Sequence, residues 1–265
     1  MSRLAETFEG LRRRGKRALI PFITAGDPHP GATRELLLEL ARAGAGVIEL
    51  GVPFSDPVAD GPVIQRASER ALRHQVGVAE ALAAVADARR ETDVPVVLFS
   101  YFNPLMQFGV ERLAREARRA GVDGVLVTDL VPEEERDFAA VLAAEGLDQI
   151  FLVAPTTTDA RLRLVAERAQ GFIYAVSRAG VTGARTEISA EAEKLVARVR
   201  SVSPLPVAVG FGITTKEHVA EVWRYADAAV VGSAIVAEVE KAAEGPELLS
   251  RVGRFTRSLI PPSDS

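Results

Sequence analysis

Eight short apolar segments recur along the 265-residue chain, and each is followed by turn residues and a longer segment with helical spacing. Apolar runs of this length are typical of strands in a parallel sheet, which is covered on both faces. Eight such units in a chain of this length favour an α/β fold closed into a (β/α)8 TIM barrel over an open sheet. The runs are Ala18–Thr24, Val47–Leu50, Val96–Phe99, Val125–Val127, Ile150–Val153, Phe172–Val176, Val207–Val209 and Ala228–Val231.

The segments between these runs place apolar residues three and four positions apart, which predicts helices. They are Glu35–Ala43, Val78–Arg89, Glu111–Ala120, Glu133–Ala144, Arg161–Ala169, Ala190–Val199, Lys216–Arg224 and Leu248–Leu259. An extra N-terminal helix, Arg3–Arg14, precedes the first strand, and we expect it to plug the barrel floor. The stretch Pro62–Arg73 also has helical spacing, so the second strand–helix connection is long, as functional connections often are. No composition break divides the chain, which predicts one domain over residues 1–265.

Composition excludes several classes of protein. The chain has no cysteine, which rules out disulfides, zinc–thiolate sites, iron–sulfur clusters and cysteine nucleophiles. Its net charge of −4 argues against nucleic acid as the main partner. The basic cluster Arg12–Arg17 is interpreted as the solvated end of the N-terminal helix. No apolar stretch is long enough to span a membrane and the N-terminus lacks a signal-peptide core, so a cytoplasmic protein is expected.

Glu49 is the most unusual residue in a predicted strand. Side chains alternate along a strand, so Glu49 shares a face with Val47 and Gly51, while Ile48 and Leu50 face the helices. Glu49 would then point into the barrel near its carboxyl end, where barrel enzymes place their chemistry. Burial there raises the pKa of a carboxyl, as a general acid–base requires. The structural alternative is a salt bridge inside the barrel.

Two other residues are candidates for catalysis on weaker grounds. Asp60 closes the proline-stiffened loop that begins at Gly51, and it could equally be a turn or helix-capping residue. Tyr174 lies in the sixth predicted strand, where its hydroxyl could bind a substrate oxygen or its ring could simply fill the core.

Glycine-rich loops follow the last two predicted strands. Gly210-Phe211-Gly212 follows the seventh strand, and Gly232-Ser233 follows the eighth and opens a helix. Barrels that bind phosphorylated substrates hold the phosphate at these loops through backbone N–H groups, although ordinary turns would have the same glycines. The polar loop 177–187 after the sixth strand is interpreted as a mobile lid, with a functionless loop as the alternative.

Lysine and histidine positions narrow the chemistry further. None of the four lysines falls at the end of a predicted strand, which argues against Schiff-base catalysis; they are Lys16, Lys194, Lys216 and Lys241. His29, His74 and His218 are scattered and lack metal-ligand spacing, so no metal site is predicted. Cleavage of a phosphorylated substrate would therefore depend on carboxylates.

Five segments carry a resemblance to a known family, in chain order from about residue 18 to residue 240. They are Pro21–Pro28, Ile48–Pro62, Ser177–Gly183, Gly210–Ile213 and Gly232–Val236. Together they resemble the signature segments of the tryptophan synthase alpha subunit family. That family is a barrel lyase of tryptophan biosynthesis, which splits indole-3-glycerol phosphate into indole and glyceraldehyde 3-phosphate. The stretch Asp129–Pro132 falls where the family itself varies.

The resemblance implies a role for each matching residue. Glu49 would protonate the indole ring carbon and also serve at the glycerol hydroxyl, Asp60 would accept the indole N–H, and Tyr174 would lie beside the glycerol chain. The remaining implied sites are the phosphate contacts Gly183, Gly212, Gly232 and Ser233, the indole pocket Phe22, Phe99, Leu152 and Phe211, and the lid residues Arg178 and Thr182, of which Thr182 would bond Asp60.

The resemblance also implies a partner. The family works in an alpha2-beta2 complex with a beta subunit that carries pyridoxal phosphate, so no cofactor is expected in this chain. Loop residues expected to face the partner are Asp56, Pro57, Asn103, Pro104, Phe108 and Pro132. Two alternatives stay open: another phosphosugar enzyme on the same scaffold, which a metal dependence would indicate, and a non-catalytic regulatory barrel, against which Glu49 and Asp60 argue.

Overall fold

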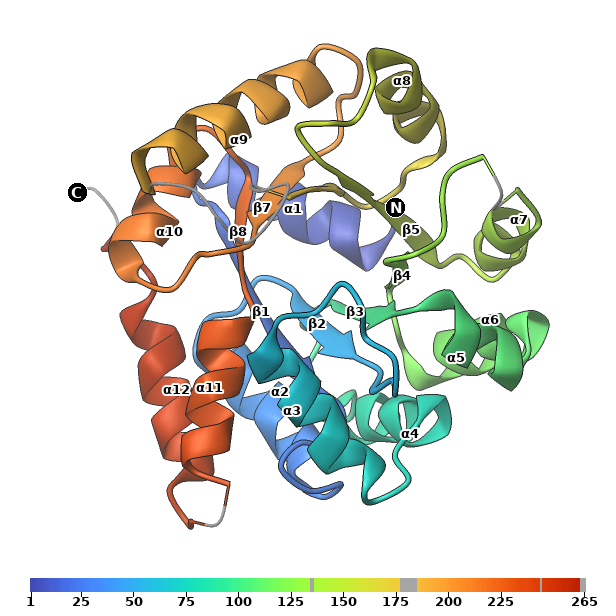
Figure 1. The fold of residues 1–265 in the computed structure, drawn as a ribbon, viewed down its shortest axis with the longest axis vertical. Helices are drawn as coiled ribbons and strands as arrows, with labels where there is room; N and C mark the ends of the chain where they lie inside the picture. The colour runs from blue at the N-terminus through green and yellow to red at the C-terminus, as the bar shows by residue number, and fades with distance from the viewer. Residues whose placement is uncertain (134–135, 177–184, 244, 263–265) are drawn as a thin grey trace.

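The computed structural model describes residues 1–133, 136–176, 185–243 and 245–262, and only the backbone of residues 185–189. Eight parallel strands close into a barrel in sequence order, with β8 paired to β1 (Figure 1). The (β/α)8 barrel predicted from the repeating pattern is confirmed. The strands are β1 (Ala18–Thr24), β2 (Ile48–Gly51), β3 (Val96–Ser100), β4 (Gly124–Val127), β5 (Asp148–Val153), β6 (Ile173–Val176), β7 (Val207–Gly210) and β8 (Ala228–Val231).

Helices surround the barrel, and the predicted helices agree with them to within a few residues at most ends. They are α1 (Arg3–Arg13), α2 (Ala32–Arg42), α3 (Pro62–Leu72), α4 (Val78–Ala88), α5 (Phe102–Phe108), α6 (Val110–Ala120), α7 (Arg136–Ala144), α8 (Asp159–Arg168), α9 (Arg185–Arg200), α10 (Lys216–Trp223), α11 (Ser233–Lys241) and α12 (Leu248–Ser258). In the described part of the chain, no helix has both the length and the apolar character that crossing a membrane would need.

Helix α5 corrects one prediction. Asn103, Pro104 and Phe108 were expected in a loop, but all three lie within this short helix. Pro104 is compatible with it, because residues in the first turn of a helix have no intrahelical partner for their N–H groups. Gly109, at φ 92°, separates α5 from α6.

Strand alternation sorts the core into two layers. Residues such as Ile48 and Leu50 face outward and pack against the helices. The inward residues form a separate cluster inside the barrel, which contains Ala18, Ile20, Val47, Val97, Leu126, Ile150, Phe172, Tyr174, Ala208, Ala228 and Val230. The barrel is therefore filled with side chains and is not an open channel.

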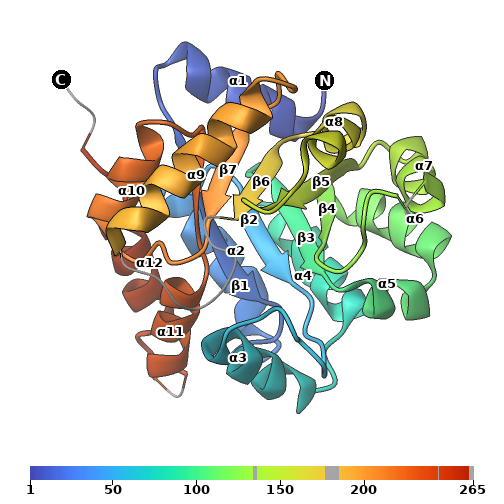
Figure 2. The same cartoon turned by 45° about the horizontal axis from the view of Figure 1, so that its top comes forward.

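Helix α1 closes the amino-terminal end of the barrel, as predicted. Its Leu4 and Phe8 join the interior cluster, and the Phe8 ring centroid lies 5.7 Å from that of Phe172. Figure 2 shows α1 and α3 at opposite ends of the strands. The floor of the barrel is thus sealed by apolar side chains from a segment outside the repeating units.

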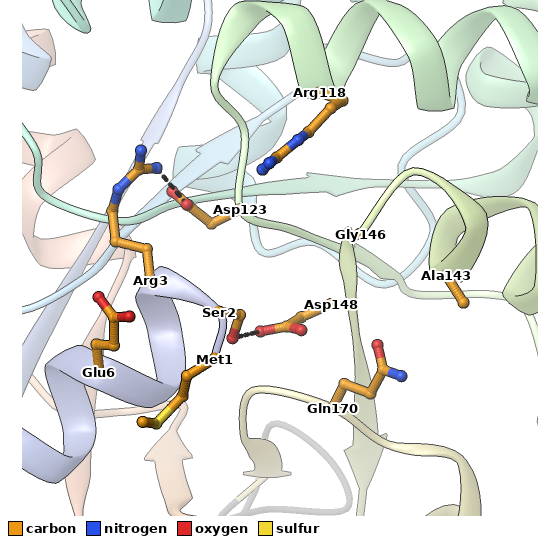
Figure 3. A pocket seen from close by; sticks show the side chains of 10 residues that line it. All are labelled: Met1, Ser2, Arg3, Glu6, Arg118, Asp123, Ala143, Gly146, Asp148 and Gln170. Atoms are coloured by element: carbon orange, nitrogen blue, oxygen red, sulfur yellow. Dashed lines mark hydrogen bonds and ion pairs between the residues drawn. The ribbon is translucent and has the colours of Figure 1, made fainter.

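A polar cavity of about 600 Å³ lies at this floor, beside the start of α1 (Figure 3). Ser2 caps α1 and donates a 2.5 Å hydrogen bond to Asp148 at the start of β5. Arg3 pairs with the buried Asp123, which also binds Arg89 at 3.0 Å. These contacts join α1 to the amino ends of the strands, at the end opposite to Glu49.

Candidate active site

Glu49 lies on β2, next to Phe22 of β1 and Val97 of β3, and its side chain is only 1% exposed. The inward direction predicted from alternation is confirmed, since its strand neighbours Ile48 and Leu50 belong to the outer core. Burial raises the pKa of Glu49 to about 8, and its buried Oε1 atom has no hydrogen-bond partner among the described residues. Among the described residues, no cation pairs with Glu49 in an interior salt bridge, and burial is the cause of the shift in its pKa. Glu49 is therefore a mainly uncharged carboxyl at neutral pH.

Tyr174 projects into the barrel from β6. A Cβ added to Gly210 would stand 1.9 Å from the Tyr174 hydroxyl oxygen, so the phenol lies directly against the backbone at the end of β7. Burial, and secondarily the charge of Glu49, raise the pKa of Tyr174 well above its usual value. The hydroxyl therefore stays protonated at neutral pH and can donate a hydrogen bond to a substrate oxygen.

Asp60 is half-buried in the loop between β2 and α3. Burial raises its pKa to about 6, and a hydrogen bond from Tyr101 partly opposes that rise. The Tyr101 hydroxyl also accepts a 2.9 Å hydrogen bond from the N–H of Ala59. The Asp60 carboxyl is therefore mainly ionised at neutral pH and can accept a hydrogen bond or stabilise a developing positive charge.

Sequence reasoning missed Tyr101, which directly follows β3. Its ring centroid lies 5.2 Å from that of Phe54 in the Asp60 loop, and burial is the main reason that its own pKa is raised to about 12. Tyr101 thus contacts the loop at Phe54, Ala59 and Asp60. An aromatic residue at the carboxyl end of a predicted strand is the signal that could have indicated it.

The four proposed indole-pocket residues lie at the carboxyl-terminal half of the barrel. Phe22 and Phe99 make an edge-to-face pair with centroids 5.4 Å apart. Leu152 packs on the interior cluster and is paired in register with Tyr174. Phe211 is 48% exposed and has φ 78°, a backbone conformation that residues other than glycine rarely adopt.

The proposed phosphate residues surround the ends of β7 and β8. Gly212 has φ 76°, and a Cβ added there would meet nothing within 4 Å. Gly232 is the N-cap of α11, and Ser233 is the first residue of that helix. An open glycine loop beside a helix N-terminus is suited to hold a phosphate through N–H groups.

The predicted partner residues lie in the described part of the chain, whereas the predicted lid residues do not. Arg178, Thr182 and Gly183 lie outside the described residues, so their assignments stay predictions of the sequence. Asp56 and Asn103 are exposed, whereas Pro57, Pro104 and Phe108 are partly buried. Pro132 is buried and its carbonyl accepts a hydrogen bond from Arg168, which argues against direct partner contact through its side chain.

The described residues contain no group of three or more histidine or acidic side chains placed to hold a metal ion. What the fold and the site define is a barrel enzyme with one uncharged and one ionised carboxyl facing a glycine-rich rim. Such a pair can deliver a proton at one point of a substrate while stabilising positive charge at another.

The chain belongs to the tryptophan synthase alpha chain family, whose sequence pattern matches residues 8–257. The tryptophan synthase alpha chain of Solibacter usitatus is 48% identical over 259 residues, which are 98% of this chain and 97% of the relative. The reaction is therefore the indole-3-glycerol-phosphate lyase step of tryptophan biosynthesis, and in this family the pyridoxal phosphate lies in the beta subunit.

Solved structures agree with this assignment. Tryptophan synthase subunit alpha from Legionella pneumophila has a TM-score of 0.90 and 39% identity, with 98% of this chain and 97% of that chain covered. A structure of the tryptophan synthase α2β2 complex from Pyrococcus furiosus has a TM-score of 0.85 and 41% identity, with 91% of this chain and 97% of that chain covered.

Proposed function

We propose that Glu49 and Asp60 divide the acid–base chemistry of the lyase reaction. The protonated Glu49 carboxyl gives its proton to indole C3, which converts the ring to an indolenine with positive charge on nitrogen. Asp60 accepts the indole N–H and stabilises this charge. The Glu49 carboxylate then removes the proton of the adjacent glycerol hydroxyl. The bond from C3 to that carbon breaks, its electrons restore the indole ring, and glyceraldehyde 3-phosphate leaves.

The observation that carries this division is the difference between the two carboxyl environments. Both pKa values are raised by burial, to about 8 for Glu49 and to about 6 for Asp60. At neutral pH, Glu49 is thus the proton donor and Asp60 the anion, which is the pair of states that the first step requires. The indole ring accepts the electrons itself, so the proposed step needs neither a lysine imine nor a metal.

The rest of the site positions the substrate in this proposal. The N–H groups at Gly212 and Gly232 and the hydroxyl of Ser233 hold the phosphate, and the Tyr174 hydroxyl lies beside the glycerol chain. Phe22 and Phe99 form one wall of the indole pocket, while Leu152 and Phe211 complete it. The support is their shared location at the carboxyl ends of the strands, where barrel enzymes bind substrates.

We also propose that the chain acts as one cytoplasmic domain that docks on its beta subunit through the catalytic face. The Pyrococcus furiosus relative was solved as an α2β2 complex. Here Asp56 and Pro57 lie in the Asp60 loop, and the N–H of Phe102 at the start of α5 donates a 2.7 Å hydrogen bond to Asp129. Asn103 is two residues after Tyr101, which hydrogen-bonds Asp60. A partner that contacts Asn103 would thus act on the position of Tyr101 and, through this hydrogen bond, on Asp60.

Turnover of indole-3-glycerol phosphate by the purified chain tests this function. We expect slow release of indole from the chain alone and faster release when the beta subunit is added. Absence of indole under both conditions would refute the proposed chemistry. A rate that depends on an added divalent metal would instead indicate a different enzyme on the same scaffold.

A further inference from the structure

Helix α3 is an insertion between β2 and the barrel helix α4, and it packs against β1 and α11. Phe22 of β1, Ala67 of α3 and Val236 of α11 form one buried apolar cluster, against which Ile64 packs. This cluster stands beside the proposed phosphate rim, since a Cβ added to Gly232 would lie 3.8 Å from Phe22 and 3.9 Å from Ile64.

A second, ionic cluster joins the same three segments. Arg70 of α3 binds Asp27, which follows β1, with Nε–Oδ1 at 2.7 Å and Nη2–Oδ2 at 3.1 Å. Arg70 also binds Glu240 of α11, with Nη1–Oε1 at 2.7 Å. Arg70 follows Ala67 by three positions and Glu240 follows Val236 by four, so each helix uses one face for both clusters.

Arg66 offers a natural comparison within this network. Its guanidinium binds both oxygens of Glu240, at 2.7 and 2.8 Å, whereas the carboxylate of Asp27 is bound by Arg70. The Arg66 side chain is 48% exposed, whereas Arg70 is 19% and Asp27 is 2% exposed. Exposed ion pairs contribute little, while a buried carboxylate depends on its cation. The contact that fixes α3 is therefore that of Arg70 with Asp27.

The position of α3 bears directly on the catalytic residues. The helix begins at Pro62, two residues after Asp60, and Gln65 Nε2 donates a 3.0 Å hydrogen bond to the Asp60 carbonyl. Ile64 and Ala67 support Phe22, which is next to Glu49 on the neighbouring strand. The rim at Gly212 and Gly232 offers backbone N–H groups, which the hydrogen bonds of the sheet hold in place at the ends of β7 and β8. Asp60, in contrast, lies in the loop that leads into α3, and the Phe22 side chain packs directly on this helix. A shift of α3 would therefore disturb the indole half of the site more than the phosphate half.

We propose that Arg70 is a positioning residue for the lyase reaction. By joining Asp27 to Glu240 it holds α3, and with it Asp60 and the Phe22 wall, at a fixed distance from the phosphate rim. This role rests on the proposed function of Asp60 and of the rim.

The test compares Arg70→Met with Arg66→Met in the full-length chain, with folding checked by circular dichroism. Displacement of a reacting group by a fraction of an ångström lowers turnover strongly, so we expect Arg70→Met to lower kcat by about tenfold or more. The Kd for indole should rise about fivefold, while the Kd for inorganic phosphate changes by less than about twofold, because only the indole half is displaced. Arg66→Met should leave all three values within about twofold of the wild type, as expected for an exposed pair.

Glu240→Gln covers the possibility that Arg70→Met does not fold. It leaves Asp27 paired and weakens only the connection of α3 to α11, and we expect a loss of kcat of about threefold, larger than that of Arg66→Met. The role of Arg70 is overturned if every folded variant matches Arg66→Met, or if indole and phosphate affinity fall together. A wild-type chain that neither binds indole nor cleaves the substrate would instead refute the site itself.

Discussion

At the residue scale, two carboxyl groups acquire different protonation states from their surroundings. Glu49 is enclosed by the barrel, and burial alone raises its pKa to about 8. Asp60 is also desolvated, but the hydrogen bond from Tyr101 opposes the shift and its pKa is raised only to about 6. The hydrogen bond from Tyr101 therefore widens the difference between the pKa values of Glu49 and Asp60, on which the proposed chemistry depends.

The pH dependence of kcat/KM should reflect both groups. The rate falls as Asp60 becomes protonated below about pH 6 and as Glu49 loses its proton above about pH 8, which gives a bell-shaped profile.

Tyr101→Phe removes the hydrogen bond that lowers the pKa of Asp60, so we expect the acid limb of this profile to move to higher pH. The phenylalanine ring keeps the contact with Phe54, and the alkaline limb serves as the internal control. An unmoved acid limb would show that Tyr101 does not act on Asp60.

At the scale of elements, periodicity was sufficient to predict the strands and most helices. Each strand is a short apolar run between turn residues, and the predicted Pro62–Arg73 helix matches α3. Helix α5 was missed because seven residues with a proline show too little periodicity to identify a helix.

The candidate site was only partly predictable for a related physical reason. Alternation along a strand gives the direction of Glu49, because that information is local. The contact of Tyr101 with Asp60 and the pairing of Arg70 with Asp27 join residues 41 and 43 positions apart, and no local pattern encodes them. The position of the glycine loops after the seventh and eighth strands predicted a phosphate site, and the resemblance to a family added the substrate that would carry the phosphate.

The glycine loop after β7 allows a matched test of phosphate binding. Gly212 and Gly146 both have positive φ, at 76° and 69°, and a Cβ added to either meets nothing within 4 Å. Replacing either glycine by leucine should therefore destabilise the protein by about 1 kcal/mol through backbone strain. Gly146 precedes β5 at the barrel floor, so only Gly212→Leu should raise KM, by about tenfold. Equal KM values for the two variants would contradict the phosphate assignment.

At the scale of the whole molecule, the two ends of the barrel have separate tasks. The candidate active site uses the carboxyl ends of the strands, while the amino ends hold α1 through buried polar contacts such as that of Arg3 with Asp123. Barrel folds commonly divide function and stability in this way. Substitutions at the floor of the barrel should therefore change the stability of the fold without changing catalysis.

Asp123→Ala tests this separation. The buried carboxylate binds Arg3, Arg89 and the N–H of Val96, so its loss should lower the free energy of unfolding by about 2–3 kcal/mol, as expected for hydrogen bonds to a charged group. Arg118→Ala, an exposed residue of the same cavity, should change it by less than about 0.5 kcal/mol. Urea unfolding measures both, and kcat/KM should stay near the wild-type value. A large loss of activity in folded Asp123→Ala would contradict the division.

In the proposed reaction, an uncharged Glu49, buried inside the barrel, delivers the proton that starts cleavage. The most direct measurement is kcat for indole-3-glycerol phosphate in Glu49→Gln, together with the Kd for inorganic phosphate. The substituted amide keeps the size of the side chain but has no acidic proton to transfer, so we expect kcat to fall by about 100-fold or more with phosphate affinity unchanged. A variant that turns over at the wild-type rate would show that Glu49 is a structural residue and not the proton donor.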